Sequence, residues 1–414
     1  MRLGMFSGQQ SPIAIDFGAS SVKLMQLDRS DPPQLLAAAE LVIPEMIRTS
    51  PQHVMAHIEQ EIPTLLKSGD FKGKKVVTAI PAALTHIQHM QVATMEGVGL
   101  EEIVKGQIEM QMECLPGSLV VRCIQVPQAK CRDSSRSEVI CFAASRDVVM
   151  RYVQMLKRCK LEVSSMHTES LSTIWAFANQ RQRQEDKSSP TMYINLGWQG
   201  SMVTVCHGTK LVFSRYIHLG GHHLDQQIAK ILKCEIHEAS TQRQSFEQPL
   251  SRSEISDEAS ESMSGETPVR ANAAKNGDSK GTDSSTVTAI DRRQQENSDD
   301  LLPVPMCGSA RSVIERYELD ELADTLVDEI SMCLRYHRGM FNNVPISKVV
   351  FVGGEARQSW LTRTIADYLT IEARVGDPLR QFADTELFTP GLNLNEPRPG
   401  WAVACGLCHA PTDA

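Results

Sequence analysis

One short pattern occurs twice in this chain, and it restricts the fold more than any other feature of the sequence. Residues 13–27 read IAIDFGASSVKLMQL, and residues 193–205 read YINLGWQGSMVTV. Each copy alternates apolar residues as a strand does, turns at a glycine and resumes as a second alternating run. Residues 35–43 and 211–217 can each add a third strand. The repeat predicts an α/β chain with two related halves that face one another.

The turn of the first copy carries groups that suit a phosphate. Gly18 lacks the Cβ that would block a close approach, and successive backbone N–H groups in such a turn can point at one anion. Ser20 and Ser21 add hydroxyl donors, and Lys23 can reach the same phosphates as a point charge. Asp16 suits a Mg²⁺ ion, which keeps most of its waters. We therefore predict a phosphate site with Mg²⁺ held by Asp16 through water.

Two later turns resemble the first. The second copy of the hairpin turns at NLGWQG and is followed by a Gly-Gly pair before an amphipathic helix. A third turn, GGE, follows the strand 348–352 and precedes a helix, which is a place where a nucleoside often docks. The candidate nucleotide-binding residues of these turns are Asn195, Gly197, Gln199, Gly200, Gly220, Gly221, Gly353, Gly354 and Glu355. Each turn alone is weak evidence, so the prediction rests on the three occurring in this order.

Charge and hydropathy argue against a nucleic-acid-binding, membrane-spanning or secreted protein. The 414 residues carry a formal net charge of −8, which gives no electrostatic case for binding nucleic acid. No stretch approaches the roughly 18–20 continuous apolar residues of a membrane span. The first twelve residues lack the apolar segment of a secretory signal. We therefore expect a cytoplasmic protein of two or more domains.

Each half contains an additional segment beyond its hairpin: an α+β unit in the first half and a polar insertion in the second. Residues 85–165 read as strand, helix, strand, strand and helix, which predicts a compact α+β unit. A helix is expected at about 166–179, and it carries Glu169. Residues 243–312 are dominated by Ser, Glu, Asp, Asn and Gly, and such a segment cannot bury enough apolar surface to offset its chain entropy. We predict a disordered insertion there.

Cysteine usage favours reduced thiols. The eleven cysteines are scattered, mostly within apolar runs, and no second close pair accompanies Cys405 and Cys408. A zinc site would need further paired ligands, so these two are predicted to be core thiols of a C-terminal helix.

The order of the three turns resembles the actin-like ATPase superfamily, and within it the PilM family of type IV pilus assembly and competence proteins. The residues that carry the resemblance are IDFGASSVKLMQL, KVVTAIPAALTHIQHM, FSRYIHLGGHHLDQQIAKIL, KVVFVGGEARQSWLTRTIADYL and VGDPL. It covers nearly the whole chain apart from the insertion. It implies an actin-like fold in which two duplicated halves surround a nucleotide cleft, with ATP and Mg²⁺ as ligands.

The resemblance also implies a division into domains. The first half is expected to have a core at 11–84, to which 166–188 and 398–412 return, and an extra subdomain at 85–165. The second half is expected to have a core at 190–230, to which 346–397 return, and a smaller subdomain at 231–242 and 313–345. The insertion at 243–312 interrupts this smaller subdomain.

Two residues of the second hairpin depart from the family pattern, which usually has Asp-x-Gly-Ala. Asn195 keeps the size of an aspartate but not its charge, so it cannot act as a base or hold a hydrated cation as strongly. Trp198 either occupies space that a phosphate needs or packs on the neighbouring subdomain. By the resemblance, Glu169 lies where an acid orients the attacking water, although a surface or capping role is as good an interpretation. We expect at most weak ATPase activity.

The resemblance implies a scaffold rather than an enzyme. Its expected partner is the N-terminal cytoplasmic tail of a bitopic inner-membrane pilus protein, held in a groove beside the extra subdomain, which would place the chain at the inner membrane through that partner. Pilus motor ATPases and self-association are further contacts that it leaves open. The alternatives are an FtsA-like division protein, which usually ends in an amphipathic membrane-binding helix that LCHAPTDA does not provide, and a small-molecule kinase, for which Asn195 is unsuited.

Overall fold

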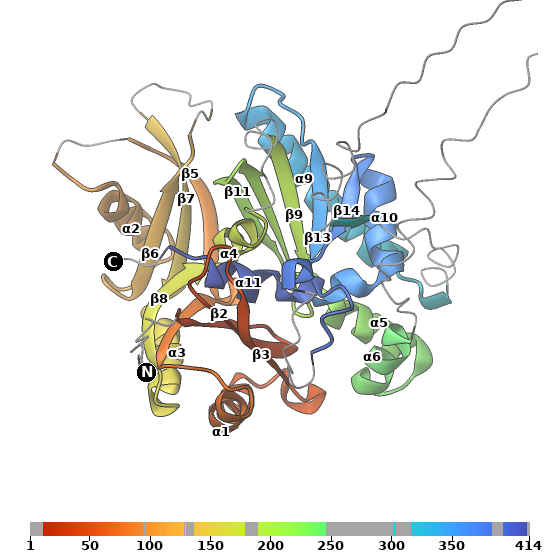
Figure 1. The fold of residues 1–414 in the computed structure, drawn as a ribbon. Coiled ribbons are helices and arrows are strands. Elements are labelled where there is room, and N and C mark those ends of the chain that lie inside the picture. The colour runs from red at the N-terminus through yellow and green to blue at the C-terminus, as the bar shows by residue number, and fades with distance from the viewer. Residues whose placement is uncertain are drawn as a thin grey trace, which may run out of the picture.

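The computed structural model describes residues 11–93, 97–127, 129, 136–178, 189–245, 301–303, 316–382 and 392–411. Most of the predicted insertion at 243–312 lies outside the described residues, as does the whole of 180–188. The described elements form two sheets that lie side by side, with a third, smaller sheet at one edge (Figure 1).

The first half of the chain contributes the first sheet and the small one. Its elements are β1 (Ile13–Phe17), β2 (Ser21–Leu27), β3 (Leu35–Val42), η1 (Glu45–Ile47), α1 (Pro51–Ser68), β4 (Lys75–Ile80), η2 (Ala82–Leu84), β5 (His86–Ala93), α2 (Leu100–Gln111), β6 (Leu119–Gln125), β7 (Arg136–Ser145), α3 (Arg146–Arg158), β8 (Glu162–Thr168) and α4 (Glu169–Ala176).

The second half contributes the second sheet and its helices. Its elements are β9 (Pro190–Leu196), β10 (Ser201–His207), β11 (Lys210–Ile217), α5 (Gly221–Leu232), α6 (Ile236–Gln244), β12 (Leu301–Pro303), α9 (Asp320–Met340), β13 (Lys348–Val352), η3 (Gly354–Arg357), α10 (Ser359–Leu369), β14 (Ala373–Gly376), η4 (Arg380–Phe382), η5 (Pro399–Trp401) and α11 (Ala402–Cys408).

The two large sheets repeat one topology, as the duplicated hairpin predicts. The first has the order β3-β2-β1-β4-β8, and the second has the order β11-β10-β9-β13-β14-β12. In each sheet an antiparallel meander is extended by two strands that run parallel to its first strand, and β12 adds an antiparallel edge strand to the second sheet. The actin-like prediction of two duplicated halves is confirmed.

Strand alternation decides which residues of β1 face the interior between the halves. Ile13, Ile15 and Phe17 pack in a core that also contains residues of α1 and α3. Ala14 belongs to the large core between the sheets, and Asp16 shares its face because successive side chains of a strand point to opposite sides. Asp16 is thus presented to the second half of the molecule.

Two short helices separate the sheets. α11 contacts β1, β2 and β4, while α4 contacts β10 and β11, and the two helices pack against each other. A Cβ on Gly406 would overlap the Ser172 carbonyl, so the helices approach as closely as they do because this position is glycine. Cys405 and Cys408 of α11 are thiols within this packing, as predicted, and burial raises the pKa of Cys408 well above its usual value.

The extra subdomain is smaller than the prediction of 85–165. It comprises the sheet β5-β7-β6 and α2, which pack in a core of their own. Met155 and Leu156 of α3 instead join the core of the first sheet, and β8 pairs with β4. Residues 146–165 therefore belong to the first half, because their apolar side chains are buried against its outer face.

Three other expectations require correction. The predicted helix at about 166–179 is the end of strand β8 followed by α4. Within the insertion predicted at 243–312, Arg243 is buried in α6, and residues 301–303 pair with β14 as β12. α9 packs against β11 and α10, so residues 320–340 cover the second sheet instead of forming a smaller subdomain with α6.

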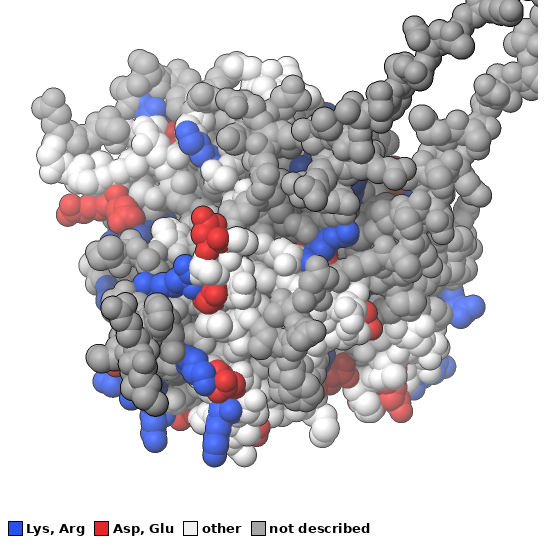
Figure 2. All heavy atoms as spheres, in the orientation of Figure 1, with Lys and Arg blue, Asp and Glu red and all other residues white. Residues whose placement is uncertain are grey.

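The described surface has mixed charge. Figure 2 shows acidic and basic side chains interspersed over one face, without an extended patch of either sign among the residues coloured there. No described helix is long and apolar enough to cross a membrane.

Candidate functional site

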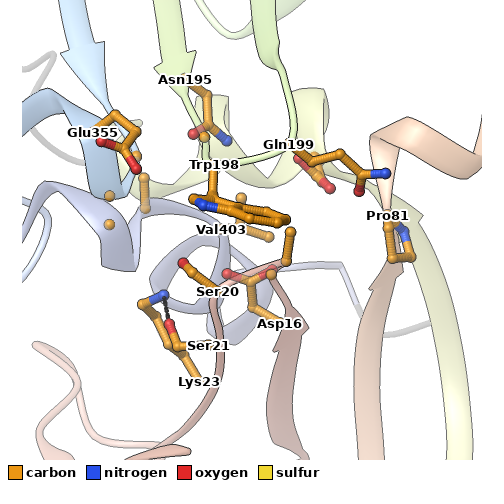
Figure 3. A pocket seen from close by; sticks show the side chains of 18 of the residues that line it. Asp16, Ser20, Ser21, Lys23, Pro81, Asn195, Trp198, Gln199, Glu355 and Val403 are labelled. Atoms are coloured by element: carbon orange, nitrogen blue, oxygen red, sulfur yellow. Dashed lines mark hydrogen bonds between the residues drawn. The ribbon is translucent and has the colours of Figure 1, made fainter. Parts of the chain in front are cut away.

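A pocket of about 390 Å³ opens where the two halves meet. The turn between β1 and β2 lies on one side, the turn between β9 and β10 lies on the other, and η3 and η5 complete the lining (Figure 3). The predicted site residues that line it are Asp16, Gly18, Ser20, Ser21, Lys23, Glu169, Asn195, Gly197, Gln199, Gly200, Gly353, Gly354 and Glu355. The structure therefore brings the three predicted turns together in one cavity.

Asp16 and Lys23 form the charged centre of the first turn. They are directly opposite each other on β1 and β2, so their side chains share one face of the sheet. Lys23 Nζ donates a hydrogen bond to Ser21 Oγ at 2.7 Å and lies 3.5 Å from Glu40 Oε1. Burial raises the pKa of Asp16 to about 6, an effect that the Lys23 charge opposes and the Glu40 charge increases. A carboxylate held in this way would be stabilised by a cation.

Glu169 is the first residue of α4, placed at the pocket by the end of β8. Its carboxylate accepts a hydrogen bond from the Ala82 N–H at 2.7 Å. Burial and, secondly, the charge of Asp16 raise the pKa of Glu169 to about 8. At neutral pH this group therefore carries its proton unless a cation enters the pocket, since a bound cation favours the charged forms of both acids.

The second turn has the same backbone form as the first. A Cβ on Gly18 would lie 2.7 Å from the Ser21 carbonyl oxygen, and a Cβ on Gly197 would lie 2.8 Å from that of Gly200. Neither turn has room for a side chain at this position. The repeated sequence has thus produced a repeated local structure, with Asn195 in the place that Asp16 holds in the first copy.

Gly220 and Gly221, predicted as binding residues, lie behind the second turn and do not line the pocket. A Cβ on Gly220 would collide with the Gly197 carbonyl, and one on Gly221 would collide with the Glu355 carboxylate. Their small size lets the start of α5 approach, where the Gly221 N–H donates to Gly197 O at 3.1 Å. These glycines position the second turn.

Trp198 lines the pocket and also packs on α5, as the second interpretation of this residue predicted, while its effect on a phosphate stays a prediction. Its indole Nε1 donates to Asp225 Oδ2 at 3.2 Å, and its ring centroid lies 4.5 Å from that of His222. The guanidinium carbon of Arg48, from the first half, lies 5.4 Å from the centroid of the indole ring. The indole is thus in contact with both halves.

Arg243 is the main functional candidate that the sequence did not reveal. It is fully buried, and its Nε donates to Asp225 Oδ1 at 2.7 Å while its two Nη atoms donate to the carboxylate of Glu355. Through Asp225 it supports Trp198, and through Glu355 it supports the third turn. In the structure the Glu235 N–H donates to the Glu238 carboxylate at the start of α6, but Glu235 is not one of the usual N-cap residues, so the sequence carries only a weak sign that this helix begins here. Further cations that line the pocket are Arg48, Arg357 and Arg398.

Comparison with known proteins identifies the family. Residues 14–254 match the family model described as type IV pilus assembly protein PilM. The chain belongs to the PilM family. The family is one of type IV pilus biogenesis proteins, and this confirms the resemblance seen in the sequence. A search of curated proteins gives no match.

One solved structure supports the fold of this PilM family member, and two others resemble it with lower TM-scores. A structure described as a PilM-PilN type IV pilus biogenesis complex is 17% identical, with a TM-score of 0.68 over 96% of this chain and 97% of the other. The ethanolamine utilization protein EutJ from Carboxydothermus hydrogenoformans is 10% identical, with a TM-score of 0.46 over 96% and 89%. An activator of 2-hydroxyisocaproyl-CoA dehydratase from Clostridium difficile, with bound ADPNP, is 12% identical, with a TM-score of 0.38 over 96% and 93%. The likeness to the PilM-PilN complex supports the actin-like ATPase fold, and this fold implies a nucleotide site.

Proposed function

We propose that this protein is a nucleotide-binding scaffold of type IV pilus assembly that holds the N-terminal tail of a PilN-like membrane protein. The proposal is supported most by the likeness over nearly the full length of both chains to a PilM solved in a complex with PilN. The nucleotide fixes the relative position of the two halves, and the tail binds beside the extra subdomain.

The ligand of the central pocket is an adenine nucleotide, with ATP and Mg²⁺ as the pair that the first turn suits. Lys23 binds a phosphate, Asp16 holds the hydrated metal, and the N–H groups of the turn at Gly18 face the anion. The turn at Gly353 and Gly354 receives the nucleoside. Gly353 has a φ of 94°, and a Cβ there would overlap the Asn195 side chain, so only glycine brings these two turns together.

A groove of about 820 Å³ suits the tail. It lies between β5, an edge strand of the extra subdomain, and β11, an edge strand of the second sheet, with α9 at one side. Its apolar and aromatic lining residues are Ala83, Leu84, Ile87, Phe213, Tyr216, Met332 and Tyr336. An extended peptide can add to a strand edge through main-chain hydrogen bonds and place alternate side chains in such pockets.

The charge of the groove indicates which tail would bind. Arg215, His86, His89 and His218 are among the lining residues, and none of the described lining residues is acidic, although Arg215 Nη2 is paired with Glu329 at 2.5 Å. Burial lowers the pKa of His89 to about 4, so its ring is neutral and can accept from the Ser214 N–H at 3.3 Å. A tail that alternates apolar with neutral or acidic residues fits this groove better than a basic one.

The pocket is better suited to holding a nucleotide than to hydrolysing it. Asn195 supplies no second negative charge for a hydrated metal, and Glu169 holds its proton at neutral pH until a cation lowers its pKa. Slow turnover follows, with the nucleotide acting chiefly as a structural ligand.

Peptide binding tests the proposal. Synthetic N-terminal tails of PilN-like proteins should bind the full chain in calorimetry, and Leu84→Ser, which truncates an exposed side chain in the groove, should weaken binding about tenfold, in keeping with a loss of 1–2 kcal/mol of buried apolar contact. Leu115→Ser is the matched control, because Leu115 is exposed near the extra subdomain but does not line the groove. Equal affinities for the two variants would rule out this groove.

A further inference from the structure

The two turns that face the nucleotide pocket differ in the size of the residue that follows the first glycine. Trp198 follows Gly197 as Ala19 follows Gly18, so a large ring stands in one copy where a methyl group stands in the other. Figure 3 shows the indole lying between the second turn and the side chains of Ser20 and Asp16 in the first. It occupies part of the space in which the end of a phosphate chain would meet both turns.

The indole is held in this position from outside the pocket. Its N–H is bound by Asp225, which is itself paired with buried Arg243, and its ring packs against His222. A rotation of the side chain away from the pocket would break this hydrogen bond and leave Asp225 Oδ2 with only the Arg243 Nη2 donor at 3.3 Å, and the loss of a buried hydrogen bond carries a free-energy penalty. The ring is therefore a fixed part of the pocket wall.

The electrostatics of the ring also disfavour a terminal phosphate. The face of an aromatic ring is the negative end of its quadrupole, which attracts cations and repels anions; Arg48, a cation that also lines the pocket, lies over this ring and offsets part of that repulsion. The positive N–H edge is already used by Asp225. Asn195 adds no charge that would hold a metal ion beside an extra phosphate on this side.

We propose that Trp198 limits the length of the phosphate chain, so that the pocket binds a nucleoside diphosphate more tightly than the corresponding triphosphate. The first turn, with Lys23 and Asp16, still holds the inner phosphates. The inference rests on the proposed nucleotide site and names the ligand form that this site prefers.

Calorimetry with ADP and with ATP, each with Mg²⁺, tests the inference on the full chain. The wild type should bind ADP at least about tenfold more tightly than ATP, and Trp198→Ala, which restores the residue of the first copy, should bring the two affinities within about threefold, chiefly by improving ATP binding. Trp198→Phe keeps a ring and loses only the N–H, so it should retain the preference for ADP. Trp175→Phe, which lies outside the pocket lining, is the control for loss of an indole.

The outcomes separate this inference from the proposed function. If the wild type binds ATP as tightly as ADP, or if Trp198→Ala retains the wild-type ratio, the role of Trp198 is refuted while the nucleotide site stands. If neither nucleotide binds, both are refuted. The wild-type ratio needs no substitution, so the inference can fail even if Trp198→Ala does not fold.

Discussion

Replacing Arg243 should destabilise the protein more than any single surface change. Its side chain is 0% exposed and forms ion pairs with Asp225, also 0% exposed, and with Glu355, which is 13% exposed. Arg243→Met keeps much of the volume but leaves two carboxylates without their cation. Breaking a buried pair in this way costs about 3–5 kcal/mol, so we expect the free energy of unfolding to fall by about 4 kcal/mol.

Urea unfolding followed by circular dichroism measures this loss. The matched control is Arg122→Met, because the pair of Arg122 with Glu101 is exposed and should contribute less than about 1 kcal/mol. The loss for Arg243→Met should be smaller at acidic pH. Burial already raises the pKa of Asp225, and without Arg243 this pKa would rise further, so protonation then removes the unpaired charge at a higher pH.

Making Arg243→Met in a variant that lacks both carboxylates separates the effect of the lost charge from the effect of the changed packing. With Asp225→Asn and Glu355→Gln already present, Arg243→Met should cost much less, since no buried negative charge is left without a partner. If Arg243→Met costs under about 1 kcal/mol in the wild type, or if it costs the same in both backgrounds, the electrostatic reasoning is wrong.

Three further predictions concern the pocket. Lys23→Ala should weaken Mg²⁺-nucleotide binding about tenfold, in keeping with a charge-assisted contact of 1.5–3 kcal/mol, while Lys72→Ala at an exposed site should not; calorimetry showing equal affinities would contradict this. Glu169 has a pKa of about 8 when folded and near 4.5 when unfolded, so the folded protein binds more protons and the free energy of unfolding should fall, by up to about 5 kcal/mol, as the pH rises between these values. Urea unfolding at several pH values should show a much shallower slope in Glu169→Gln, with the remaining slope due to Asp16, whose pKa is raised to about 6. Asn195→Asp should raise ATP hydrolysis in a phosphate-release assay with little change in affinity, whereas a wild-type rate near about 1 per second would show that another acid carries the step.

The local parts of the fold could be read from the sequence. The two hairpins were predicted because alternation and a tight glycine turn are properties of neighbouring residues, and Gly18 and Gly197 need no distant partner to form their turns. The three turns meet in one pocket because each follows a strand of a duplicated sheet. The predicted roles of Glu169 and of Asp16 in catalysis and metal binding stay predictions.

The parts that were missed depend on distant residues. β8 carries Ser164, Ser165 and His167 and resembles no buried strand by itself, but it is completed by parallel pairing with β4. Arg243 follows a polar stretch of sequence, and its two carboxylate partners lie 18 and 112 residues away. The predicted boundary at residue 165 was wrong because α3 packs in the core of the first sheet, and the sequence of a helix does not show which sheet it packs against.

The extra subdomain is joined to the first half by the chain but touches the second half through its edge strand. β5 contacts β11, His89 stacks on Phe213 with 4.8 Å between ring centroids, and Tyr336 of α9 donates to Glu138 of β7. The small sheet therefore spans the boundary between the halves outside the pocket lining, and the groove there shares Ala83 and Tyr216 with the pocket. Any rotation of one half relative to the other must strain or widen the contact between β5 and β11. The width of the groove between these strands therefore changes with the angle between the two halves.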